Sequence, residues 1–238
     1  MAYNESAEKE VLKTLNAPTY PIYQISRLVG ISKWTVKRYL GGYEYKYYAG
    51  GRHREGRQRP VINPDEEIRY ASFLDLVDLL YVKEFLKRGF TLYFLRKALD
   101  EARERLGTPH FARSVFYTSG KQIVLDLPKD GNLIALMTSG QLTIQEITEK
   151  LSLKLDFENV TGFGLAERWY PNGKRGSIVI DPKVSFGQPH IIGYNTSTNN
   201  IYDLYLGENK KIVPVSEWFN IPTPKIKTAV QFEHGLWG

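Results

Sequence analysis

The chain has 238 residues, a mass of 27.4 kDa and no cysteine, so disulfides, thiolate metal sites and cysteine nucleophiles are excluded. Apolar residues make up 42% and charged residues 24%, as in ordinary globular proteins. No apolar run approaches the ~20 residues that cross a bilayer, and the polar start has no signal-peptide pattern. We therefore expect a cytoplasmic protein without membrane contact.

The net charge of +6 is confined to the first half of the chain. Residues 1–115 hold 20 Lys and Arg against 14 Asp and Glu, whereas residues 116–238 hold 12 of each. Between Arg27 and Arg59, nine basic residues are accompanied by two acidic ones. A localised positive field attracts phosphate backbones or acidic membranes, although an ordinary solvated surface has the same composition.

Residues 20–40 predict two short helices joined by a sharp turn. Apolar residues recur at helical spacing on both sides of Gly30, which supplies the positive φ that a tight helix end needs. Ser32 is a suitable N-cap for the second helix, whose buried face would contain Val36 and Leu40. This pattern is typical of a helix-turn-helix, although an αα-hairpin inside a larger helical core produces the same signals.

The outward positions of this helix pair are basic, aromatic or hydroxyl-bearing. A helix with such side chains fits the major groove, where they reach phosphates and base edges. The residues that we expect to contact DNA here are Arg27, Ser32, Lys33, Trp34, Thr35, Lys37 and Arg38.

A tyrosine-rich strand over residues 43–48, a turn at Gly50-Gly51 and an extended segment that resumes at residues 61–62 are expected to form a wing. The arginine-rich stretch between the turn and this segment would be its tip, placed along the DNA backbone or in the minor groove. A disordered basic loop is the alternative. The expected contacts in this stretch are Arg52, Arg54, Arg57 and Arg59.

The remaining pattern predicts an α+β fold. Residues 65–106 have helical periodicity, with Ser72 as a possible cap, and strand patterns begin at Ser114. The predicted organisation is an N-terminal arm (1–19), a winged helix-turn-helix (20–62), a helical hairpin (63–112), a mixed segment (113–169) and a C-terminal domain (170–238).

Residues 215–226 repeat the pattern of residues 25–36, with Asn220 at the position of Gly30. Asparagine is the residue after glycine that best tolerates left-handed geometry. The charges of this second helix-turn-helix are balanced, which favours packing or protein binding over DNA binding.

Two stretches resemble known families. Residues 20–106, with a helix pair, a wing and a second helical pair, resemble the MerR-like winged helix-turn-helix. Residues 178–232 are similar to the small C-terminal domain of VapB-type antitoxins. In that family a strand ends in Asp-Pro, and Gly-x-Pro-x-Ile-x-Gly and a helix-turn-helix follow. The corresponding sequences here are Asp181-Pro182 and Gly187–Gly193.

The resemblance implies an antitoxin of a type II toxin-antitoxin pair. Such a protein binds its own double-stranded DNA operator as a homodimer and neutralises a toxin, here a PIN-like ribonuclease. The family usually has Thr-Arg shortly after the second glycine, whereas residues 194–196 contain no arginine. We therefore carry over no role for that arginine.

The expected toxin contacts are side chains that project from the C-terminal half. Lys174 and Arg175 lie in a loop bounded by turn-forming residues, and Trp237 lies near the end of the chain. The alternative function is a MerR-like ligand-sensing transcriptional regulator. The ligand would then lie among Phe116, Trp169 and Tyr170.

Catalysis is not expected. The acidic residues are scattered, and the four histidines lack metal-ligand spacing. The Gly-x-Gly at residues 162–164 lacks the Lys-Ser/Thr of a phosphate loop, and there is no Gly-x-Ser-x-Gly elbow. The sequence therefore predicts no catalytic residue, no cofactor and no metal.

Overall fold

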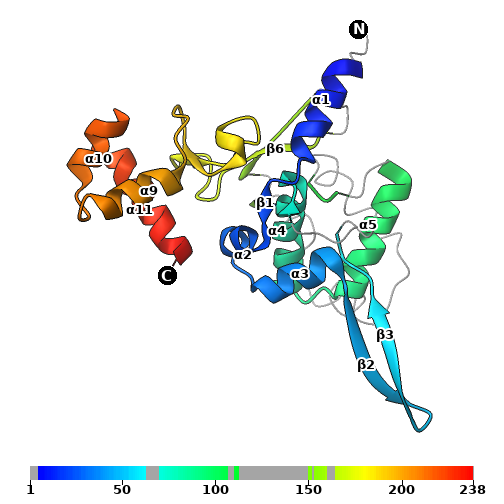
Figure 1. The fold of residues 1–238 in the computed structure, drawn as a ribbon. Coiled ribbons are helices and arrows are strands. Elements are labelled where there is room, and N and C mark those ends of the chain that lie inside the picture. The colour runs from blue at the N-terminus through cyan, green and yellow to red at the C-terminus, as the bar shows by residue number, and fades with distance from the viewer. Residues whose placement is uncertain are drawn as a thin grey trace.

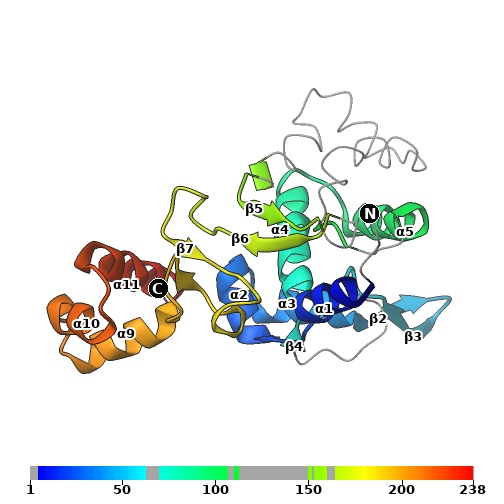
Figure 2. The ribbon, with the colours of Figure 1, turned by 90° about the horizontal axis from the view of Figure 1, so that it is seen from above.

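The fold is α+β, as predicted, with helices joined by short antiparallel strand pairs (Figures 1 and 2). It was obtained as a computed structural model, which describes residues 5–62, 70–106, 110–112, 150–151, 153–159 and 164–237. The strands expected at 115–117, 123–125 and 133–137, and most of the helix expected at 142–151, lie outside these ranges.

The helices in the described ranges are α1 (Glu5–Leu15), α2 (Ile22–Val29), α3 (Lys33–Gly41), α4 (Phe73–Lys87), α5 (Leu92–Leu106), α9 (Thr198–Gly207), α10 (Ile212–Phe219) and α11 (Thr223–Trp237). The antiparallel pairs are β1 (Tyr20–Pro21) with β4 (Tyr70–Ala71), β2 (Tyr43–Ala49) with β3 (Arg52–Gln58), β5 (Leu155–Phe157) with β6 (Ala166–Trp169), and β7 (Ile178–Val179) with β8 (His190–Ile191). The 3-10 turn η1 (Ser185–Gly187) lies between β7 and β8.

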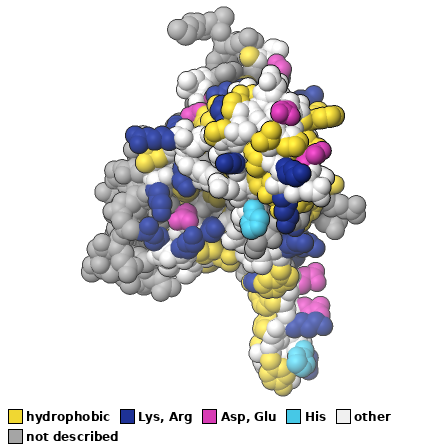
Figure 3. Space-filling model, turned by 90° about the vertical axis from the view of Figure 1, so that its left-hand side faces the viewer, with side chains coloured by type: hydrophobic (Ala, Val, Ile, Leu, Met, Phe, Trp, Pro, Cys, Tyr) yellow, Lys and Arg dark blue, Asp and Glu magenta, His cyan; other side chains and the backbone are white. Residues whose placement is uncertain are grey.

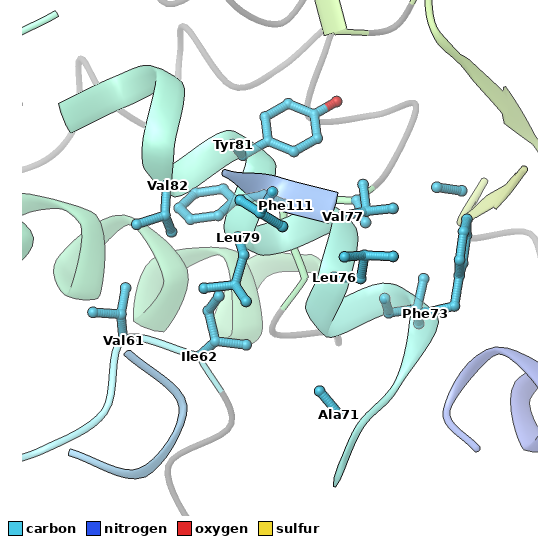
Figure 4. Packing of buried hydrophobic residues seen from close by; sticks show 14 of the residues in the cluster. Val61, Ile62, Ala71, Phe73, Leu76, Val77, Leu79, Tyr81, Val82 and Phe111 are labelled. Atoms are coloured by element: carbon cyan, nitrogen blue, oxygen red, sulfur yellow. The ribbon is translucent and has the colours of Figure 1, made fainter. Parts of the chain in front are cut away.

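Helix α4 is the centre of the larger core, and almost every side of it is buried (Figure 4). Its start is fixed by a capping box, in which Ser72 N donates to Asp75 Oδ2 at 2.8 Å and Asp75 N donates to Ser72 Oγ at 3.1 Å. The cap predicted at Ser72 is therefore confirmed. Apolar side chains from Leu15 to Ile180 belong to this cluster, so the predicted segments share one core.

A buried acid holds the chain after α5 against α4. Asp78 Oδ2 lies 2.6 Å from His110 Nδ1, and Asp78 Oδ1 accepts the Ala112 N–H at 2.8 Å. Burial raises the pKa of the Asp78 carboxyl above its ordinary value, and these two bonds oppose that shift. Phe111, between the two partners, packs with its ring centroid 6.3 Å from that of Tyr81.

A second, smaller core lies between α9, α10 and α11 at the C-terminal end. It joins the N-terminal half through the residues around η1. The hydroxyl of Tyr20 donates to Gly187 O at 2.7 Å, and the side chains of Gln24 and Gln188 form a hydrogen bond. The end of α11 therefore lies beside α2, as Figure 1 shows.

The contact at Gly187 gives a test of this junction. Gly187 has a φ of +73°, and a Cβ there would lie 2.5 Å from Tyr20 Oη. Gly193 has a φ of +86° with nothing within 4 Å of its Cβ position. We expect Gly187→Ala to lower the free energy of unfolding by about 2–4 kcal/mol and Gly193→Ala by about 1–2 kcal/mol. Urea denaturation measures both, and equal losses would contradict the close contact with Tyr20.

Candidate nucleic-acid interface

The two helices and the turn lie where the sequence predicts them. Helix α2 ends at Gly30, which has φ 69° and ψ 50° and donates its N–H to Ser26 O at 2.9 Å. The Ser26 hydroxyl donates to Ile31 O at 2.7 Å, which closes the turn. Ser32 then caps α3 by accepting the Thr35 N–H at 3.0 Å.

Helix α3 presents the face that the sequence predicts. Val36 and Leu40 are fully buried against the core. Lys33, Trp34 and Lys37 are exposed. The outward side of α3 therefore offers two exposed ammonium groups beside an exposed indole ring.

Arg38 has a different environment from these neighbours, because two aromatic rings enclose it. Its Cζ lies 4.2 Å from the ring centroid of Trp34 and 3.7 Å from that of Tyr43. Its Nε is buried without a hydrogen-bond partner in the described parts of the chain. Cation–π contacts of this kind orient a guanidinium. Arg38 therefore connects α3 to β2 and fixes the angle between the helix and the wing.

The wing differs from the prediction in its second strand. Residues 52–58, expected as the tip, form β3 and pair with β2 over seven positions. The turn predicted at Gly50-Gly51 is confirmed and forms the tip, where both φ angles are positive (59° and 75°), as a two-residue hairpin turn requires. Val61 and Ile62, where the sequence predicts that an extended segment resumes, are buried in the core. Polar residues are tolerated in β3 because both faces of this hairpin are largely exposed.

The two faces of the wing differ in chemistry (Figure 3). Directly paired residues of an antiparallel hairpin share a face. One face carries Tyr43, Tyr45 and Tyr47, whose successive ring centroids are 6.0 and 5.7 Å apart, with Arg52 and Arg54 towards the tip. The opposite face carries the alternating charged residues, which include the ion pair of Lys46 and Glu55 at 3.4 Å.

The sequence does not reveal that the expected DNA contacts Arg57 and Arg59 lie far from the tip. Arg57 pairs with Glu44 on the charged face of the wing. Arg59 forms two hydrogen bonds with Asp100 of α5, one of them 3.1 Å long, and these bonds raise the pKa of its guanidinium. Arg96 Nε donates to the carbonyl oxygen of Arg59 at 3.1 Å. Arg59 therefore anchors the base of the wing to α5.

Arg27 lies on α2, with its Cζ 5.7 Å from the ring centroid of Tyr23. Both residues line a polar cleft of about 560 Å³ between α2 and the C-terminal helices. Asn199, Asn200 and Asp203 line its other wall. The cleft exists because two distant segments pack together, so no local pattern in the sequence indicates it.

The second helix-turn-helix repeats the hydrogen bonds of the first one. Asn220 ends α10 with φ 53° and ψ 45°, and the Ser216 hydroxyl donates to Ile221 O at 2.6 Å. The predicted structural repeat is confirmed, since Ser26 and Ile31 form the same pair at 2.7 Å. The surfaces differ, because α11 has Thr223 and Pro224 where α3 has a lysine and a tryptophan.

The predicted toxin contacts have different environments. Lys174 Nζ forms an ion pair with Asp156 Oδ1 at 2.7 Å, whereas Arg175 is exposed. Burial would raise the pKa of Asp156, but hydrogen bonds from Lys174 and Tyr170 hold it below its ordinary value. Trp237 is the last residue of α11, and its side chain lies outside the described atoms.

Two of the three residues considered for the ligand site of a sensing regulator lie in the described ranges. Trp169 is buried in the larger core, and the Tyr170 hydroxyl donates to Asp156 Oδ2 at 2.6 Å. Phe116 lies outside the described ranges. Within those ranges, no three acidic or histidine side chains could together hold a metal ion, and no helix is long and apolar enough to span a membrane.

Comparison with known proteins shows a structural likeness. No family model and no curated protein matches the sequence. The crystal structure of Rv2018 from Mycobacterium tuberculosis is similar, with a TM-score of 0.64 over 91% of this chain and 98% of that one, at 16% sequence identity. At this identity the likeness shows a shared fold.

The repeated turn predicts matched effects of two substitutions. Ser26→Ala and Ser216→Ala each remove one hydroxyl that donates to a carbonyl five residues later. We expect each to lower the free energy of unfolding by about 1 kcal/mol, because one part-buried carbonyl loses its donor. Urea denaturation with separate tryptophan and far-ultraviolet dichroism signals measures both. An effect at Ser26 with none at Ser216 would show that the second turn does not depend on this bond.

Proposed function

We propose that this chain is a non-enzymatic, cytoplasmic DNA-binding antitoxin. Its N-terminal half binds double-stranded operator DNA as a homodimer and represses its own gene. Its C-terminal half neutralises a PIN-like ribonuclease toxin. The observation that carries the DNA-binding half is the exposed basic face of α3, which Arg38 links directly to the wing.

In this proposal α3 enters the major groove. An α-helix fits that groove, and Lys33 and Lys37 reach phosphates or guanine edges from it. Trp34 supplies an apolar surface beside them. The wing, held at its base by the Arg38 stack, brings Arg52 and Arg54 to the adjacent backbone or minor groove. Two copies related by a two-fold axis would read a palindromic operator.

The toxin-binding half of the proposal rests on the sequence resemblance and on the balanced charge of the second helix-turn-helix. Lys225 and Lys227 are offset there by Glu217 and Glu233. DNA affinity depends strongly on phosphate neutralisation. A balanced unit of the same fold is better suited to a protein partner than to DNA.

The salt dependence of operator binding tests the role of α3. Lys37 is exposed on the outward side of the helix, and Lys211 is an exposed lysine beside α10 in the charge-balanced C-terminal unit. We expect Lys37→Ala to weaken operator binding and to reduce the slope of log affinity against log salt by about 0.9, since one phosphate contact is lost. Lys211→Ala should leave this slope nearly unchanged.

Fluorescence anisotropy with the DNA upstream of the gene, over a series of salt concentrations, measures both slopes. Thermal melts show that each variant is folded. A Lys37→Ala protein with the wild-type affinity and slope would overturn the assignment of α3 as the recognition helix.

Co-expression with the product of the adjacent gene tests the antitoxin half. We expect the two proteins to elute together from a sizing column, and the chain to block RNA cleavage by its partner when DNA is absent. A fully active neighbouring product that elutes separately would remove the antitoxin function. The DNA-binding half of the proposal would then stand as a transcriptional regulator.

A further inference from the structure

The turn η1 contains a phenylalanine whose backbone conformation is strained and whose side chain is exposed to solvent. Phe186 has a φ of 54° and a ψ of 36°, and its side chain is 89% exposed. Ser185 before it and Gly187 after it also have positive φ, at 49° and 73°. L-residues rarely adopt this geometry, and an exposed ring gains nothing from burial.

The surroundings of η1 enforce this conformation. The Ser185 hydroxyl donates to the Asn195 carbonyl oxygen. Gly187 donates its N–H to Val184 O at 2.9 Å and accepts the Tyr20 hydroxyl at 2.7 Å. Strained residues that are held in this way cluster at ligand clamps and functional sites. The exposure of Phe186 is therefore a fixed feature of the turn.

A second apolar side chain lies on the turn that η1 is tied to. The bond from Ser185 to Asn195 brings η1 to the segment after β8, where Ile192 is 39% exposed. Lys225 lies at this segment, with its Nζ 4.8 Å from the Tyr194 ring centroid and 3.5 Å from Ile192 O.

A second lysine comes shortly before the turn in the chain. Lys183 precedes η1 and forms an ion pair with Glu167 at 3.4 Å. Phe186 and Ile192, with Lys183 ahead of η1 and Lys225 at the carbonyl oxygen of Ile192, are here called the Phe186 surface. Its complement is an apolar pocket bordered by carboxylates.

We propose that the Phe186 surface is where this chain docks onto its protein partner, with the ring of Phe186 in an apolar, acid-rimmed pocket of that partner. This inference rests on the proposed function, since the partner is the toxin of the pair. A few buried aromatic anchors supply most of the energy of a protein interface. The surface has only two lysines, both already in contact with neighbours, so it is poorly suited to nucleic acid.

The test uses the full chain and the product of the adjacent gene. The variant Phe186→Ser removes the ring from an exposed position. The matched control is Tyr93→Ser, which removes an aromatic side chain, 63% exposed, from α5, outside both helix-turn-helix units. We expect Phe186→Ser to weaken the complex about tenfold or more and to relieve the block on RNA cleavage. Tyr93→Ser should bind the partner like the wild-type chain.

Operator binding separates loss of docking from loss of folding, because the Phe186→Ser protein should keep wild-type affinity for DNA. A Phe186→Ser chain with wild-type affinity for the partner would overturn this site and leave the antitoxin function standing. Equal weakening by Tyr93→Ser would also overturn it, since the effect would not be specific to η1. A wild-type chain that does not bind the partner would overturn the antitoxin function and this site together.

Discussion

Burial of α4 on nearly every side is the constraint on which the rest of the structure depends. Helices α2 and α3 pack against it, and so does β6 of the strand-rich middle. Two of its acidic residues are buried and have local partners, because Asp75 caps the helix and Asp78 holds the segment at residues 110–112. The position of α3 is therefore set by the same core that holds the middle of the chain, and not by a small module folding alone.

Local signals predicted the helices and their ends well. Gly30, Ser32, Ser72 and Asn220 each lie at the helix boundary that the sequence indicates. Each of these signals involves residues at most five apart in the chain, so a helix end can be predicted from them without knowledge of the tertiary structure. The first strand of the wing and its turn were predicted, but residues 52–58 were taken as the tip and not as the second strand. This stretch is polar and largely exposed on both faces, so it lacks the alternation of apolar and polar residues that marks a strand.

The contacts that define the candidate sites join residues far apart in the chain, and this is why the sequence did not show them. Arg59 and Asp100 are 41 residues apart, and Tyr20 and Gly187 are 167 residues apart. The bond between Tyr20 and Gly187 also links the movements of two parts of the chain. Tyr20 precedes α2 directly, so any shift of η1 acts on the helix pair of the proposed DNA-binding unit. Two-state elements with such shared contacts are the physical basis of coupling between sites.

The repeated serine-closed turn has a consequence for how this chain can be altered. Its determinants are a serine hydroxyl, a left-handed residue and an isoleucine, and all of their bonds are made to the backbone of the turn itself. The outward positions of α3 and α11 take no part in them. The two helix-turn-helix units thus share the same turn, and they differ in the residues at the outward positions of their second helices. Exchanging the outward residues of one for those of the other would redirect either end without rebuilding its interior.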